Sequence, residues 1–419
     1  MLFLTTLTTL LSVASVTASP KKLSERALGL KWGSEKVRGL NIGGWLVLEP
    51  WITPSIFQNI DPSLDVRDEY TLGEKLGQDA GYQILKRHWD TWLTLQDFQK
   101  IAAAGFNTVR IPIGYWAYKT VPGEPYIQGS APYLDTAIDW ARQTGLKVWI
   151  DLHGAPGSQN GFDNSGHFVP KPMWQSGDNV ASTLSVLNII SNKYAQPQYQ
   201  DVVIAIELLN EPAGWELDSN AIRQFYREGF NQVRAVSNTP VVLHDAFMPP
   251  KNWNGFLSVS DNDAQNVVID HHEYQVFDNY LVSVSPSKHR ELVCSTVPSY
   301  SQGVDKWVVV GEWSAAMTDC ATWLNGYKTG SRYDGTFPNS AFVGSCQDKK
   351  QISSWNQAYK DDVRLFIESQ LAAYETHTQG WVFWNFKTEN AHEWDAFALL
   401  DAGIFPRPAD NNGYGAICA

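Results

Sequence analysis

The chain has 419 residues, 43% of them hydrophobic and 18% charged, which is typical of a folded core and excludes a disordered chain. The length suffices for one large α/β barrel or for two to three smaller domains. The formal net charge of −12 disfavours nucleic acid and anionic membranes as partners, because both repel an acidic surface.

The N-terminus has the pattern of an export signal. Residues 1–18 form an apolar stretch diluted by Thr and Ser that ends at Ala18, which predicts a signal peptide. Residues 19–35 show no core pattern and are expected to be a short propeptide or a flexible N-terminus, so that residues 36–419 form the folded domain. No later segment reaches the roughly 18 uninterrupted apolar residues of a transmembrane helix. We therefore expect a secreted protein without membrane contact.

Eight strand-like runs recur along the chain, with helical patterns between most of them. The runs are Val37–Leu48, Phe106–Gly114, Leu146–Gly154, Val202–Pro212, Pro240–Phe247, Asn266–Tyr274, Lys306–Ser314 and Gly380–Lys387. The expected helices are Thr91–Ala104, Tyr133–Thr144, Val180–Tyr194, Asn220–Ser237 and Trp355–Tyr374. Strands that alternate with helices form parallel sheets through right-handed crossovers. Eight such units predict a single (β/α)8 TIM barrel.

Two connections, Glu49–Thr91 and Trp313–Gln351, are much longer than the others. Long loops after barrel strands usually build the functional site, so both are predicted walls of a cleft. No Pro/Ser-rich linker and no shift of composition marks a second domain.

Two of the strand-like runs end on a glutamate. Glu211 ends the run Val202–Pro212, and Glu312 ends the run Lys306–Ser314. Burial where a core strand breaks into a loop raises the pKa of a carboxyl group, which suits a general acid near neutrality. Two such glutamates predict two-carboxylate chemistry at one rim of the barrel. The alternative for each is an ordinary carboxylate that pairs with an arginine or caps a helix.

Other strand ends are polar as well. They carry Glu49, Arg110, Asp151, His153, Asn210, His271, His272, Glu273, Tyr274 and Trp384. Polar residues gathered at one rim of an apolar barrel cost stability unless they are paired, and function is the usual reason to keep them. The 18 tryptophans equal the phenylalanines in number, and exposed indole faces stack well on sugar rings, although most of them are expected in the core.

Four cysteines, at positions 294, 320, 346 and 418, lie in the last third of the chain. An even number is consistent with two disulfides, for which three pairings are possible. No two form a Cys-x-x-Cys pair, so we expect no metal site of that kind.

Long motifs at the strand ends resemble glycoside hydrolase family 5, and more narrowly the fungal secreted exo-β-1,3-glucanases. The motifs are Arg38–Trp45, Val109–Trp116, Asp151–Gly161, Glu207–Pro212, Gly311–Trp313 and Trp381–Trp384. One motif per strand in the right order is a specific signal. The resemblance implies a retaining hydrolase that releases glucose from the non-reducing ends of β-1,3-glucan, in the extracellular space or the cell wall, without cofactor or metal.

The same resemblance assigns roles to the central residues. It implies Glu211 as acid/base and Glu312 as nucleophile. Arg110 would keep Glu312 ionised, Tyr274 would donate a hydrogen bond to it, and Asn210 would hold the sugar 2-hydroxyl. For each, the alternative is structural: a barrel ion pair, a packed tyrosine or a turn-forming asparagine.

Further residues would bind or shape the sugar site. His153 and His272 resemble site histidines, and strand alternation selects His272 because Tyr274 points inward. Trp384 would be a platform under the sugar at the −1 subsite, and Glu49 would grip the terminal sugar in a blind pocket. The alternative is that these are satisfied core residues.

At the entrance, Phe162 and Phe277 resemble an aromatic clamp, with Asp163 and Asn164 beside it. The implied disulfides are Cys294–Cys418 and Cys320–Cys346. The chain departs from the family pattern at Phe386 and Glu273, and it follows the pattern less well after Asn164 and after Pro212, which leaves the +1 and +2 subsites open.

Several functions remain open at this point. The substrate is expected to be a β-glucan polysaccharide or oligosaccharide and the protein a monomer. An endo-β-glucanase or a β-1,6-glucanase on the same fold is the alternative, and transglycosylation can compete with hydrolysis. A catalytically inactive glucan-binding wall protein would have lost one of the two carboxylates or Arg110. Glu211, Glu312 and Arg110 are all present. A nicotinamide or phosphate enzyme is disfavoured because no Gly-rich fingerprint follows a strand.

Overall fold

Eight parallel strands close into a barrel in the computed structural model, which describes residues 28–407 and Cys418. Each strand pairs in parallel with the next one along the chain, and the first pairs with the eighth. The strands are β1 (Val37–Asn41), β2 (Thr108–Gly114), β3 (Lys147–Gly154), β4 (Val203–Glu207), β5 (Val241–His244), β6 (Val267–Glu273), β7 (Trp307–Trp313) and β8 (Gly380–Phe383). The predicted (β/α)8 barrel with its eight strands is confirmed.

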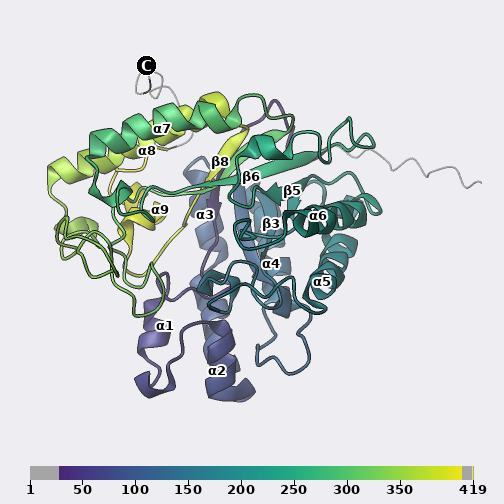
Figure 1. The fold of residues 1–419 in the computed structure, drawn as a ribbon, viewed down its shortest axis with the longest axis horizontal. Helices are drawn as coiled ribbons and strands as arrows, with labels where there is room; N and C mark the ends of the chain where they lie inside the picture. Colours follow the sequence, from purple (N-terminus) through teal and green to yellow (C-terminus); the bar gives the residue numbers. More distant parts are fainter. Residues whose placement is uncertain (1–27, 408–417, 419) are drawn as a thin grey trace, which may run out of the picture.

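Helices surround the barrel. They are α1 (Pro54–Gln58), α2 (Glu69–Trp92), α3 (Leu95–Ala103), α4 (Ala131–Thr144), α5 (Asn179–Tyr194), α6 (Ser219–Arg234), α7 (Pro286–Ser301), α8 (Gln357–His377) and α9 (Ala396–Asp401). The five predicted helices correspond to α3, α4, α5, α6 and α8. The sequence did not predict α7, because its serines and an internal Pro298 interrupt the helical pattern. The helix packs against α8, beside it in Figure 1.

Several strands are shorter than predicted. The run Val37–Leu48 leaves the sheet after Asn41, and the run Val202–Pro212 leaves it after Glu207. In both cases the chain beyond the strand stays buried although it no longer pairs in the sheet. Apolar composition reports burial and does not mark where the ladder of hydrogen bonds ends, so the predicted strands ran into the loops that carry the site.

One of the two long connections is largely helical. The segment Glu49–Thr91 contains α1 and most of α2. Its predicted role as a cleft wall is confirmed for Glu49 and Trp51, the two residues of the segment that line the cavity. Asp68 and Thr71 form a capping box that starts α2. Gly77, with a φ of 73°, then breaks the helical geometry within it, which hid the helix from sequence reading. The segment Trp313–Gln351 has no helix or strand after β7 and is a long connection as predicted.

Apolar side chains fill the bottom of the barrel. Leu30 packs there against residues of β1, β4 and β7, and Trp32 stacks on Trp307 with ring centroids 5.5 Å apart. Leu30 and Trp32 are therefore part of the packed molecule. The predicted signal peptide, residues 1–18, lies outside the described residues and stays a prediction. Among the described helices, none is both long and apolar enough to span a membrane.

Candidate active site

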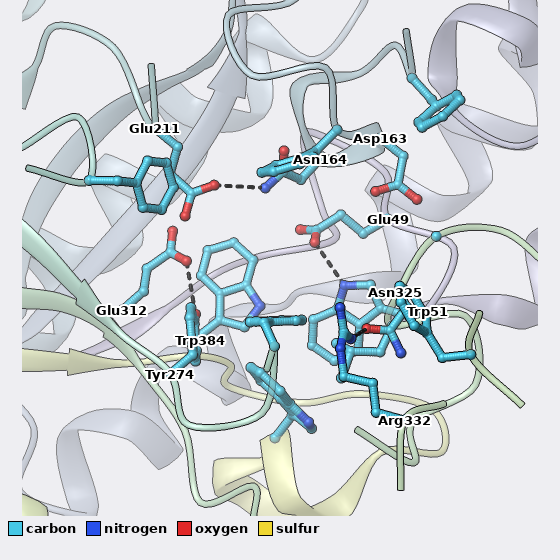
Figure 2. A pocket seen from close by; sticks show the side chains of 18 of the residues that line it. Glu49, Trp51, Asp163, Asn164, Glu211, Tyr274, Glu312, Asn325, Arg332 and Trp384 are labelled. Atoms are coloured by element: carbon cyan, nitrogen blue, oxygen red, sulfur yellow. Dashed lines mark hydrogen bonds between the residues drawn. The ribbon is translucent and has the colours of Figure 1, made fainter. Parts of the chain in front are cut away.

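A cavity of about 450 Å³ opens where the strands end. Figure 2 shows Glu211 and Glu312 on one side of it, Glu49 and Asp163 on the other, and the indole of Trp384 between them. Nine of the predicted site residues line this cavity: Glu49, Phe162, Asp163, Asn164, Glu211, Tyr274, Phe277, Glu312 and Trp384. Carboxyl ends of barrel strands thus bring together residues that are far apart in the sequence.

One ring nitrogen of His272 lies close to both Glu211 and Glu312. Nδ1 of His272 lies 2.8 Å from Oε1 of Glu211 and 3.4 Å from Oε2 of Glu312. The two facing carboxylate oxygens are therefore at most about 6 Å apart, which is compatible with the close spacing of retaining pairs. Alternation along β6 correctly selected His272, because His271 instead bonds Asp245, 2.6 Å away.

Glu211 sits on a strained backbone. Its φ of 47° lies in the left-handed region, which side chains other than glycine rarely adopt. The chain reaches it four residues after the last residue of β4, where the sheet no longer dictates the backbone. Its Oε2 accepts a hydrogen bond of 3.2 Å from Nδ2 of Asn164 (Figure 2). The turn thus aims this carboxylate into the cavity.

The pKa of Glu211 does not move in the predicted direction. Burial raises it, but the hydrogen bond and the charge of His272 outweigh burial and leave the pKa below its usual value. Burial lowers the pKa of His272, whereas the charges of Glu312 and Asp270 and its bonds to carboxylates raise that pKa well above normal. The prediction of a raised Glu211 pKa was wrong because sequence reading did not supply this protonated partner.

Glu312 accepts two hydrogen bonds and has one further charged neighbour. Nη1 of Arg110 donates at 3.0 Å and Oη of Tyr274 at 2.8 Å. Nδ1 of His272, whose hydrogen bond goes to Glu211, lies 3.4 Å from Glu312. Burial nevertheless raises the pKa of Glu312, opposed by the charges of His272 and Arg110. Both predicted contacts, the cation and the tyrosine hydroxyl, are present.

Arg110 is also the centre of a buried ion cluster. Its guanidinium lies 3.2 Å from Asp151, 2.9 Å from Glu207 and 3.6 Å from Asp270. The cluster is fully buried, and the charges of these carboxylates raise the pKa of Arg110 well above normal despite burial. The structural alternative, a barrel ion pair, is therefore also realised: Arg110 holds strands together and touches Glu312.

A layer beneath the cavity holds the remaining predicted residues. Nδ1 of His153 lies 2.6 Å from Asp151, and Asn210 accepts a bond of 2.7 Å from Arg110. The ring of His153 stacks on Trp384 with centroids 5.6 Å apart. The stacking of His153 supports Trp384 from below. That Asn210 holds a sugar hydroxyl stays a prediction.

The far end of the cavity is acidic. Nε1 of Trp51 donates to Oε2 of Glu49 at 3.0 Å, while Oε1 of Glu49 is buried and has no partner among the described residues. Burial raises the pKa of Asp163 to about 7, and burial together with Asp163 raises that of Glu49 well above normal. Buried, incompletely paired carboxyls are groups that the hydroxyls of a sugar can satisfy.

Phe162 and Phe277 stand exposed at the mouth, 42% and 45% accessible, as a clamp requires. The sequence reasoning missed other lining residues: Trp51, Phe168, Trp215, Phe247, Leu324, Asn325, Gly326, Arg332, Phe337 and Trp394. Five of them belong to the irregular segment Trp313–Gln351. Its length was the one available signal, because no periodicity shows which of its residues face inward.

The described residues include one group with metal-binding spacing, namely Glu211, His244 and His272. Both nitrogens of His272 face carboxylates, and Nδ1 of His244 accepts the backbone N–H of Ala246 at 3.0 Å. The free nitrogen of His244 must then carry the ring proton, which leaves it without a lone pair for a metal. The group therefore fits hydrogen bonding better than metal binding. The expected absence of a metal stays a prediction.

A (β/α)8 barrel with two close carboxylates at its C-terminal rim defines the class of retaining glycoside hydrolases. The family profile described as Cellulase (glycosyl hydrolase family 5) matches residues 75–331, and the chain belongs to that family.

Relatives of the chain extend over nearly its full length. The chain is 50% identical to glucan 1,3-beta-glucosidase of Blumeria graminis, with 94% of this chain and 92% of the relative covered. It is 48% identical to the enzyme of the same name from Schwanniomyces occidentalis, with 96% and 95% covered. The crystal structure of rutinosidase from Aspergillus niger superposes with a TM-score of 0.71 at 21% identity and covers 90% of this chain and 99% of its own. That structural likeness supports the fold.

Proposed function

We propose that the protein is a retaining exo-acting glucan 1,3-β-glucosidase, which releases glucose from the non-reducing ends of β-1,3-glucan. Relatives of that name with 50% and 48% identity support the linkage. The observation that carries the proposal is the pair Glu211 and Glu312, held by one histidine at one side of a cavity.

In the first step, an oxygen of Glu312 attacks the anomeric carbon. The bond from that carbon to the leaving oxygen breaks, and the leaving oxygen takes a proton from Glu211. In the second step, Glu211 removes a proton from water, whose oxygen attacks the same carbon and releases the Glu312 carboxylate. Two displacements leave the product in the β-configuration.

His272 holds the proton that Glu211 needs. With the pKa of His272 raised and that of Glu211 lowered, the proton rests on the imidazole in the free enzyme. The bond of 2.8 Å gives a direct path for it to Glu211 as the leaving oxygen gains charge. Arg110 and Tyr274 meanwhile each donate a hydrogen bond to the attacking carboxylate of Glu312.

Exo action follows from the acidic end of the cavity. Glu49 and Asp163 lie across Trp384 from Glu211 and Glu312 (Figure 2). Asn325 and Arg332 add polar groups on the same side. A chain that continued past this wall would have to displace them, so the terminal glucose ends there.

Export is the proposed location. Residues 1–18 match a signal peptide, and disulfides join Cys294 to Cys418 and Cys320 to Cys346, as the family resemblance implied. Disulfides persist in oxidising compartments outside the cytosol. We propose a secreted monomer that acts on glucan in the extracellular space or the cell wall.

The test is a time course of purified protein on laminarin, with the anomeric form of the first product followed by NMR. We expect glucose alone from the start, first as the β-anomer. A ladder of oligosaccharides would instead indicate an endo-glucanase with an open cleft. Faster release of glucose from a β-1,6-glucan than from laminarin would assign the enzyme to the β-1,6 linkage. First-formed α-glucose would overturn the double displacement.

A further inference from the structure

We propose that Trp215 is the platform of a second acceptor subsite, which holds the glucose unit that follows the one between Phe162 and Phe277. The proposal rests on the proposed function and names the part of the substrate that this wall of the cavity binds. Trp215 lines the same cavity as Glu211 and Glu312, and 58% of its surface is exposed.

Exposed aromatic rings continue outward from the clamp along one wall. The ring of Trp215 lies 6.4 Å from that of Phe162 and 4.9 Å from that of Phe247, which is itself 43% exposed and lines the cavity. An exposed apolar patch joined to a ligand cavity marks a binding surface. Both faces of a β-glucose ring present C–H bonds, so a broad indole face complements them. The continuity with the catalytic cavity therefore indicates glucose as the occupant.

The backbone holds these rings in place. A Cβ on Gly214 would lie 2.4 Å from the carbonyl oxygen of Ala246, so the loop after β4 reaches the loop after β5 only with glycine there. Ala246 and Phe247 both adopt left-handed φ values, 56° and 58°, which cost free energy in residues other than glycine. The N–H of Phe247 donates to Asp245 at 2.8 Å and fixes the turn. Strain kept at a cavity wall points to function.

The experiment compares substrates that differ by one sugar. Laminaribiose reaches only the clamp, whereas laminaritriose reaches Trp215 as well. For Trp215→Ala, we expect kcat/KM on laminaritriose to fall about tenfold, equivalent to about 1.4 kcal/mol, while kcat/KM on laminaribiose stays within twofold. Trp215→Phe keeps a smaller ring and should lose less. Phe342→Ala, which removes a ring 72% exposed outside the cavity lining, should change neither substrate.

The comparison of the two substrates decides whether Trp215 forms a subsite. Equal loss on both substrates, or no loss on either, would overturn the subsite. Retained activity on laminaribiose shows that the variant is folded. If Trp215→Ala does not fold, the same comparison is made with Trp215→Phe. Failure of the proposed function looks different, because the unaltered protein would then release no glucose from laminaribiose.

Discussion

Glu211 and Glu312 share one histidine, yet their pKa values move in opposite directions. The pKa of Glu211 is lowered and that of Glu312 is raised. Taken alone, these directions would make Glu312 the acid and Glu211 the nucleophile. The contacts favour the reverse, because Glu312 receives the permanent cation Arg110 and the hydroxyl of Tyr274, whereas Glu211 depends on His272 for its proton.

Azide rescue distinguishes the two assignments. With a dinitrophenyl β-glucoside, whose leaving group needs no acid, Glu312→Ala should lose at least about 10⁴-fold in kcat, in the range seen for lost nucleophiles. Azide then replaces the carboxylate and should form the α-glucosyl azide. In Glu211→Ala, azide replaces water in the second step and should form the β-glucosyl azide. NMR identifies the anomer. If Glu312→Ala instead formed the β-glucosyl azide and Glu211→Ala the α-glucosyl azide, the roles of the two glutamates would be reversed.

The charge of His272 sets where Glu312 ionises. His272 opposes burial and lowers the pKa of Glu312, so its removal should raise that pKa further. For His272→Gln, the acidic limb of the kcat/KM profile should move to higher pH. His244 has a pKa held well below normal by burial and carries no charge, so His244→Gln should leave the limb in place. An unmoved limb in His272→Gln would contradict this view of the charge.

Sequence alone predicted the residues that belong to motifs at the strand ends. Glu211 and Glu312 were identifiable because each follows an apolar run, and the motifs that resemble the family assigned roles to Arg110 and Tyr274 as well. The direction of the Glu211 pKa shift was not predictable, since it depends on the distance to His272 across two strands.

At the scale of elements, the connection between β7 and α8 builds a cavity wall without regular structure. Oδ2 of Asp319, a fully buried residue, accepts a bond of 2.9 Å from Asn325 and one of 2.6 Å from the backbone N–H of Arg332. Next to it, Cys320 is bonded to Cys346. One anchor thus positions two side chains that line the cavity, which no sequence period could reveal.

Loss of that disulfide should affect binding before it affects chemistry. In Cys320→Ala/Cys346→Ala, the segment is free to move away from the cavity, and KM for laminaribiose should rise several-fold while kcat stays within about twofold. The loop of 26 residues also contributes about 3.5 kcal/mol to stability through chain entropy. An unchanged KM in a folded variant, measured by steady-state kinetics, would show that the segment holds its shape without the bond.

At the scale of the whole molecule, the barrel was predictable and its surroundings were less so. Eight apolar runs with helices between them allow few other topologies. The helix α2 was missed because Gly77 interrupts its pattern, and α7 because Pro298 lies inside it. Both helices are held by long-range contacts, which a local pattern does not report.

The second disulfide acts on the whole fold. Cys418 is bonded to Cys294 in α7, 124 residues earlier, and its sulfur lies 3.7 Å from the carbonyl oxygen of Ser369 in α8. The bond therefore closes a loop that contains β7, α8, β8 and α9. None of its partners lines the catalytic cavity. Its effect should therefore fall on stability and not on catalysis.

For Cys294→Ala/Cys418→Ala, chain entropy predicts a loss of about 5 kcal/mol in the free energy of unfolding, because the closed loop is long. Urea unfolding followed by tryptophan fluorescence measures this loss. At 25 °C, KM and kcat for laminaribiose should equal those of the unaltered protein, in contrast to Cys320→Ala/Cys346→Ala. A smaller loss of stability than in that other variant would contradict the loop-length argument, and a raised KM in the folded protein would show that α7 and α8 reach the cavity through the barrel.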